Sequence, residues 1–115
     1  MKYMLLIHTP EAFYQSASKA EIEQVTGAYR AYTEAMQKAG VMTAGDRLQP
    51  AASATTVRVT NGKTTVLDGP YAETKEQLGG YYVIDVSDLD AALSWAARCP
   101  GASYGAIEVR PLWAM

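Results

Sequence analysis

The sequence predicts an α+β fold in which several strands lie beside two helices. Two stretches repeat their apolar residues every three or four positions, which is typical of amphipathic helices, and apolar runs of strand length flank them. Asn61-Gly62, between two stretches rich in threonine and valine, predicts a hairpin. Two helices cover only one face of such a sheet. Several strands are apolar at odd and even positions alike, so we expect the other face to pack against a second copy, most simply in a twofold dimer.

The first predicted strand runs from Tyr3 to His8 and stops at Thr9-Pro10. Its continuous apolar run favours a strand with both faces covered. Residues 18–21 have the pattern of a capping box, and the apolar stripe from Ile22 to Ala39 predicts a helix that ends at Gly40.

The remaining elements follow from turn residues and apolar patterns. We expect a strand from Val41 that runs to Leu48 and is closed by Pro50, and then a hairpin of Thr55 to Thr60 with Thr64 to Leu67. Two helical turns within Tyr71 to Leu78 and a strand from Gly80 to Val86 follow. A second helix is opened by Ser87 to Asp90 and stopped by Cys99 to Gly101, and a last strand runs from Ile107 to Val109. The chain therefore predicts a single domain over residues 1–115.

Composition excludes several classes of function. The chain has 115 residues, 49% of them hydrophobic, and a formal net charge of −2. Its ten basic residues are scattered singly, which disfavours direct nucleic-acid binding, and no apolar run is long enough to span a membrane. One histidine and one cysteine cannot build a zinc site alone, so we expect no metal and no cofactor. The lone Cys99 fits a reducing cytoplasm.

The longest motif in the chain joins a turn to a strand. Asp68-Gly69-Pro70 must turn, and the polar segment after it leads through Gly79-Gly80 into apolar sequence. The stretch from Asp68 to Tyr82 resembles the signature of the DGPF proteins, a branch of the YCII-related family, with Tyr71 where that family's phenylalanine stands. Similar segments occur at both ends of the chain. The resemblance implies a ferredoxin-like βαββαβ unit with an added hairpin strand, pairing as a dimeric α/β barrel.

His8 is the only histidine, and imidazole titrates in the range best suited to acid/base catalysis near neutral pH. A catalytic role requires a carboxylate partner, for which Asp46 and Asp68 at other strand ends are the candidates. The alternative is a half-exposed histidine at the end of a strand. Some relatives are thought to use a His–Asp dyad whose histidine falls on or near Tyr29 here, and no histidine stands at that position.

The signature also supplies candidate ligand-binding residues. Asp68 would orient a base or a ligand, Tyr71 would stack on the ligand, and Lys75 would attract its negative charge. Tyr82 and Asp46 would complete the lining of the site. The alternative to a binding site is a purely structural role for these residues. Asp68 would then cap the turn, the Tyr71 ring would be buried, and the charged side chains of Glu73, Lys75 and Glu76 would face water.

Two functions follow as hypotheses. The first is a small cytoplasmic protein that binds an organic ligand between helices and sheet, with weak proton-transfer or elimination chemistry on a phenolic or carboxylic molecule. The second is a regulatory protein-interaction module. It rests on the resemblance, because proteins of the family are similar to domains found beside or fused to extracytoplasmic-function sigma factors.

Overall fold

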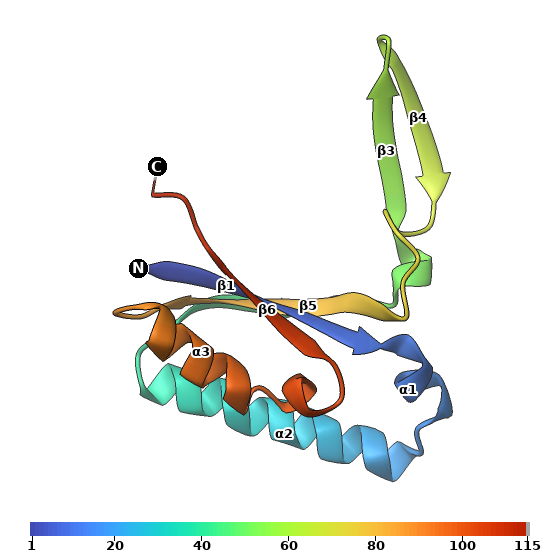
Figure 1. Ribbon diagram of the computed structural model, residues 1–115. Helices are drawn as coiled ribbons and strands as arrows, with labels where there is room; N and C mark the ends of the chain where they lie inside the picture. The colour runs from blue at the N-terminus through green and yellow to red at the C-terminus, as the bar shows by residue number, and fades with distance from the viewer. Residues whose placement is uncertain (115) are drawn as a thin grey trace.

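The structure is a computed structural model that describes residues 1–114 (Figure 1). Its elements in chain order are β1 (Lys2–Pro10), α1 (Glu11–Ser16), α2 (Lys19–Lys38), β2 (Met42–Arg47), β3 (Thr55–Thr60), β4 (Lys63–Asp68), β5 (Glu76–Asp85), α3 (Leu89–Arg98) and β6 (Ala106–Pro111). Two short 3-10 helices, Ala51–Ser53 and Pro100–Ser103, lie in the connections. Within the described residues, no helix combines the length and apolar character needed to cross a membrane.

Four strands form one antiparallel sheet in the order β2-β5-β1-β6. Along the chain, α2 connects β1 to β2 and α3 connects β5 to β6. This is the ferredoxin-like βαββαβ arrangement that the resemblance implied. The added hairpin, β3 paired with β4, forms its own two-stranded sheet and stands away from the main sheet (Figure 1). We call this hairpin the arm.

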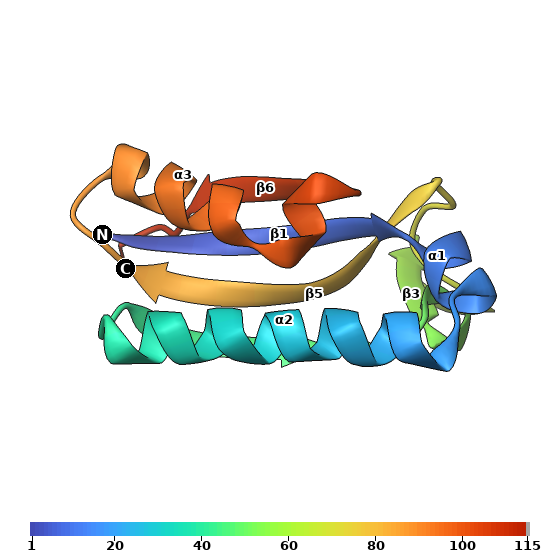
Figure 2. The same ribbon diagram turned by 90° about the horizontal axis from the view of Figure 1, so that it is seen from below.

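Both long helices lie on one face of the sheet, side by side in the view from below (Figure 2). The core fills the space between these helices and the sheet, and its largest fully buried side chains are Leu5, Met36 and Ile84. Along β1, buried residues alternate with half-buried ones, as expected for a strand with one face on the core. Met4 and Leu6 point to the other face, which no helix of the described chain covers (Figure 1). We call this the open face.

Local signals account for the helix ends. The Ser18 hydroxyl accepts a hydrogen bond from the Glu21 amide and the Glu21 side chain accepts one from the Ser18 amide, so the predicted capping box is confirmed. Asp88 caps α3 by accepting from the Ala91 amide. Asn61 and Gly62 both have positive φ angles, 51° and 77°, which is the backbone of the tight hairpin turn that this pair favours.

Two predictions about local structure are wrong. Tyr71 to Leu78 do not form helical turns, because β5 already begins at Glu76, where Pro10 and Thr9 of β1 pair with it. The preceding loop is held instead by the Gln77 side chain, which donates to the carbonyls of Ala72 and Thr74. Helix α1, which directly follows Pro10, was not predicted at all.

Candidate functional site

A partly open hollow of about 260 Å³ lies at the end of the sheet near α1, on the side of the helices. We call it the helix-side cavity. Its lining comes from β1, α1, α2, the end of β2 and the start of β5, and comprises Ile7, Thr9, Glu11, Tyr14, Gln15, Tyr29, Arg47, Leu48, Gln49, Pro50, Gln77 and Gly79. Half of these residues have polar or charged side chains and the others are apolar, aromatic or glycine, so the cavity combines apolar surface with polar groups, as small-molecule sites do.

Arg47 supplies the positive charge of this cavity. Its guanidinium carbon lies 5.3 Å from the centre of the Tyr14 ring, within the range of a cation–π contact. Among residues 1–114, Arg47 forms no ion pair. Its N–H donors therefore remain free of carboxylate partners, and a guanidinium in this state suits a carboxylate or phenolate of a ligand.

Tyr29 of α2 also lines this cavity. Burial raises the pKa of this phenol strongly, and the neighbouring Cys99 and Tyr104 raise it further. The Cys99 thiol donates to the Tyr29 oxygen over 3.9 Å. Tyr29 consequently stays protonated near neutral pH, so it can donate a hydrogen bond to a ligand but cannot accept a proton from one.

Thr9 and Gly79 shape the opposite wall. A bulge between Ile7 and His8 leaves Gly79 as the extra residue of β5. A Cβ atom on Gly79 would lie 3.4 Å from the Thr9 hydroxyl oxygen, so the glycine leaves this buried hydroxyl accessible from the cavity. Glu11 is the single carboxylate among the lining residues, and it accepts a hydrogen bond from the Ala51 amide.

A second, wider hollow of about 980 Å³ lies between the base of the arm and the main sheet. We call it the arm-side cleft. Its lining includes His8, Ala106, Tyr71, Lys75 and Leu78. Leu48, Gln49, Pro50 and Gln77 line both hollows, so these four residues form a wall shared by the cavity and the cleft.

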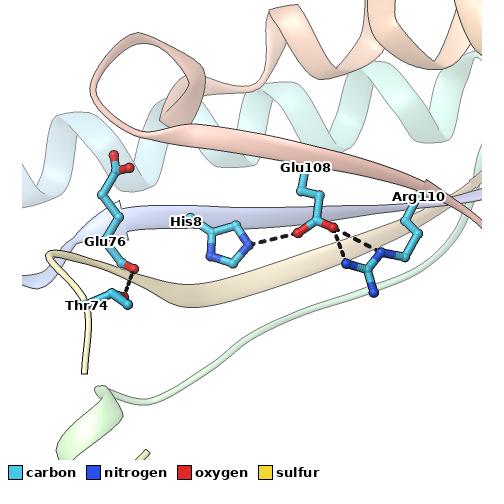
Figure 3. Close-up of polar contacts among 5 residues, drawn as sticks. All are labelled: His8, Thr74, Glu76, Glu108 and Arg110. Atoms are coloured by element: carbon cyan, nitrogen blue, oxygen red, sulfur yellow. Dashed lines mark hydrogen bonds and ion pairs between the residues drawn. The ribbon is translucent and has the colours of Figure 1, made fainter. Parts of the chain in front are cut away.

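His8 lies on the open face in a small polar cluster (Figure 3). Its Nε2 atom is 3.5 Å from a carboxylate oxygen of Glu108, and Glu108 also accepts hydrogen bonds from Arg110, one of them over 3.0 Å. The Arg110 hydrogen bond is the largest influence on the pKa of Glu108, which lies below its ordinary value. The carboxylate beside His8 is therefore Glu108 and not one of the candidates Asp46 and Asp68, because β6 runs beside β1.

Comparisons with known proteins agree with this fold. A family model, described as the YCII-related domain, matches residues 1–115. The chain belongs to the YCII-related family. An uncharacterized protein of Rhizobium meliloti (strain 1021) is 42% identical over 114 residues, which are 97% of this chain and 92% of that protein. Among solved structures, 5-chloro-2-hydroxyhydroquinone dehydrochlorinase (TftG) from Burkholderia phenoliruptrix AC1100, in complex with 2,5-dihydroxybenzoquinone, is similar with a TM-score of 0.57 and 15% identity, over 98% of this chain and 94% of that chain.

This YCII-related protein brings three of its six sequence-predicted site residues, His8, Tyr71 and Lys75, to the arm-side cleft, and the other three lie outside both hollows. Asp68 ends the arm strand β4 and is exposed. Tyr71 is 79% exposed, and the guanidinium of Arg58 lies 5.2 Å from its ring centre. Lys75 lines the arm-side cleft with His8.

The other two predicted residues lie on opposite faces of the sheet. Tyr82 is buried in the core, where its hydroxyl is 2.9 Å from the Thr33 hydroxyl. Asp46 accepts a 2.9 Å hydrogen bond from Tyr81, which is paired with Leu6 of the open face. Neither Tyr82 nor Asp46 lines either hollow.

Sequence reasoning missed Arg47, Tyr14, Glu11 and Thr9. They are distant in sequence from the family signature, and only the sheet order brings them to one cavity. One signal was available for Arg47, because a cation at the end of a predicted strand stands at a position where sites are often built. Tyr29 had been assigned to the apolar stripe of α2; it does contact the core, and it lines the cavity as well.

Proposed function

We propose that the protein binds a small aromatic anion, of phenolic or carboxylic type, in the helix-side cavity. The observation that carries the proposal is the guanidinium of Arg47, which lies over the Tyr14 ring in the lining of the cavity and has no carboxylate partner in residues 1–114. Arg47 would bind the anionic group, while the ring would pack against Tyr14 and the apolar lining. Tyr29 would donate a hydrogen bond to an oxygen of the ligand.

The size of the cavity favours a single ring. Ligand sites commonly measure about 300–1,000 Å³, and the helix-side cavity, at about 260 Å³, lies just below that range. The ligand in the similar dehydrochlorinase structure, 2,5-dihydroxybenzoquinone, is also an oxygenated single ring. It supports the chemical class of the proposed ligand.

Any proton transfer in this cavity would use Glu11. Tyr29 is excluded as a base by its raised pKa. His8 and Asp68 do not line the cavity, and the proposal assigns them no role in this site. Glu11 would act on a ligand C–H or O–H group as a general base.

A thermal-shift titration tests the binding proposal. Benzoate, 4-hydroxybenzoate and catechol are the probes, and benzamide is the neutral control. A ligand at about a hundredfold over its dissociation constant adds roughly 2.7 kcal/mol of stability, several degrees for a domain of this size. We expect benzoate to raise Tm and benzamide to leave it unchanged.

A matched pair of arginine variants locates the site. Arg47→Gln should abolish the benzoate shift. Arg58→Gln should retain it, because Arg58 also stacks on a tyrosine but lies outside the cavity. Loss of the shift in Arg58→Gln with retention in Arg47→Gln, or no shift with any of the anions, would refute the proposal.

The regulatory alternative stays a prediction. No feature of the two hollows favours contact with a sigma factor over binding of a small molecule. Affinity purification of the parent chain and of Glu73→Lys from a native host tests the regulatory alternative directly. Recovery of a sigma factor with the parent chain but not with Glu73→Lys would support it.

A further inference from the structure

The row of buried side chains along β1 ends in a polar residue. Tyr3, Leu5 and Ile7 face the core, and Thr9 continues this row with only 5% of its surface exposed. In the described chain the core is built of aliphatic, aromatic and sulfur-containing residues, and Thr9 is the one other side chain that is buried. Buried hydroxyls are normally hydrogen-bonded. Within residues 1–114, however, the Thr9 hydroxyl forms no hydrogen bond.

Packing fixes the direction in which the Thr9 hydroxyl points. The methyl group of Thr9 faces the connection before β6, because Cβ atoms on Gly101 and Gly105 would lie 3.2 and 3.0 Å from it. The hydroxyl faces β5, where a Cβ atom on Gly79 would lie 3.4 Å from its oxygen. Thr9 and Gly79 both line the helix-side cavity. The hydroxyl is therefore on the cavity side of Thr9.

Three neighbouring strands carry the groups that face one another across this cavity. In the sheet order β2-β5-β1, Arg47 ends β2, Gly79 belongs to β5 and Thr9 lies near the end of β1. Neighbouring strands are about 4.8 Å apart, so the strands that carry Arg47 and Thr9 are about 10 Å apart with Gly79 between them. The next atom from a Cβ on Gly79 would be the Ile7 carbonyl oxygen at 3.9 Å. The missing side chain leaves a floor of backbone on which a flat ring can lie.

We propose that the helix-side cavity selects aromatic acids with a hydroxyl group para to the carboxylate, and that the Thr9 hydroxyl binds this ring hydroxyl. The inference rests on the proposed binding of an aromatic anion by Arg47. With the carboxylate at Arg47 and the ring over Gly79, the substituent opposite the carboxylate points toward Thr9 on β1. A threonine hydroxyl donates and accepts, so it pairs with a phenol hydroxyl in either direction.

Two other polar side chains of the cavity come from the same end of the sheet. Gln77 is paired directly with Thr9, and its amide nitrogen already donates to the carbonyls of Ala72 and Thr74. The Gln77 side chain therefore offers a ligand only its oxygen, and the Glu11 carboxylate also only accepts. A preference for a ring hydroxyl that came from these two residues would survive Thr9→Val, whereas one that comes from Thr9 would not.

The first test needs no ligand. Thr9→Val keeps the shape of the side chain and removes the unpartnered hydroxyl, so we expect its Tm to lie within about 2 °C of the parent value or above it. Thr33→Val is the matched control, because the hydroxyl that it removes is 2.9 Å from the Tyr82 hydroxyl, and its Tm should fall. A fall of more than about 2 °C in Thr9→Val, measured by differential scanning calorimetry, would mean that the hydroxyl stabilises the folded chain, and would overturn the proposal.

Isothermal titration calorimetry with four acids tests the selection. We expect the parent chain to bind 4-hydroxybenzoate at least about fivefold more tightly than 4-methylbenzoate, as expected for one net hydrogen bond. We expect 2-hydroxybenzoate to bind no more tightly than benzoate. In Thr9→Val the two para-substituted acids should bind within about twofold of each other, while the affinity for benzoate stays within about twofold of the parent value. Thr9→Ser, which keeps the hydroxyl, should keep the preference for 4-hydroxybenzoate.

The outcomes separate this inference from the proposed function. If Arg47→Gln abolishes benzoate binding, but the preference for 4-hydroxybenzoate is absent or survives Thr9→Val, the selection by Thr9 is wrong and the proposed anion site stands. If the parent chain binds none of the acids, or if Arg47→Gln binds benzoate as the parent does, both proposals are overturned.

Discussion

Gly80→Ala should destabilise the protein although the side chain gained is a single methyl group. A Cβ atom on Gly80 would lie 2.9 Å from the carbonyl oxygen of Asp46 and 3.5 Å from the Cα atom of Arg47. The first distance is shorter than a normal contact, and the obstacle is backbone that belongs to the neighbouring strand β2. The strand must therefore move away from β5, or the pairing at Arg47 and Gly80 must weaken.

The size of the effect follows from two opposing contributions. Overpacking of this kind costs about 1–3 kcal/mol, whereas replacing glycine by alanine stabilises by about 0.4–1 kcal/mol through the unfolded chain. We expect a net loss of about 1–2 kcal/mol. For a domain slightly over 100 residues this is a decrease in Tm of roughly 4–8 °C, measurable by differential scanning calorimetry.

Gly79→Ala is the matched control, because Gly79 precedes Gly80 directly and its surroundings leave room for a methyl group. The closest atom to its added Cβ would be the Thr9 hydroxyl oxygen at 3.4 Å, an ordinary contact. We expect Tm to be unchanged or slightly raised and the benzoate shift to be reduced, since the methyl group enters the helix-side cavity. If Gly79→Ala lowers Tm more than Gly80→Ala, the reasoning about the two contacts is refuted.

Three further predictions concern the core and the titrating groups. Met36→Ala removes a side chain with no exposed area and should cost about 2–5 kcal/mol, measured by urea unfolding; a cost below about 1 kcal/mol would contradict the assigned core. Burial raises the pKa of Tyr104 to about 12. The contribution of this raised pKa to the free energy of unfolding is therefore complete below the ordinary phenol pKa and is lost as the pH rises through about 12. The free energy of unfolding of Tyr104→Phe should fall less steeply with pH in this alkaline range than that of the parent chain. The pKa of Glu108 is lowered, mainly by Arg110. The contribution of Glu108 to the free energy of unfolding is therefore present above the ordinary carboxyl pKa and is lost as the pH falls through the lowered value. In Glu108→Gln, the free energy of unfolding should fall less steeply at acid pH than in the parent chain, and an unchanged slope would exclude this role.

The fold was largely predictable because its strongest signals are local. The capping box at Ser18 and the Asn61-Gly62 turn act within four residues, and each lies where the sequence predicted it. Helix α3 begins within the predicted segment Ser87 to Asp90, where Asp88 caps it. Residues 71–78 were predicted wrongly as helix because their charges and the following glycine resemble a helix end. Pairing with Thr9 and Pro10, which are more than sixty residues away, decides the structure of Glu76 and Gln77 instead.

The candidate site was less predictable because it depends on which strands are neighbours. The order β2-β5-β1-β6 brings Glu108 to His8 and Arg47 to the end of β1, and no local pattern contains that order. A bulge at Ile7 and His8 further changes which residues of β5 face the helices. Predicted groups such as Asp68 and Tyr71 lie on or near the arm, outside the cavity that the distant Arg47 and Tyr29 help to form.

Because the two hollows share part of their lining, a molecule bound in one of them bears on the shape of the other. Leu48, Gln49, Pro50 and Gln77 line both the cavity proposed to hold a ligand and the arm-side cleft. If an aromatic anion displaces these residues, the affinity of the cleft for a molecule bound there changes by some factor, and occupation of the cleft must change the affinity for the anion by the same factor. Titrating the anion with and without a molecule bound in the cleft measures this coupling.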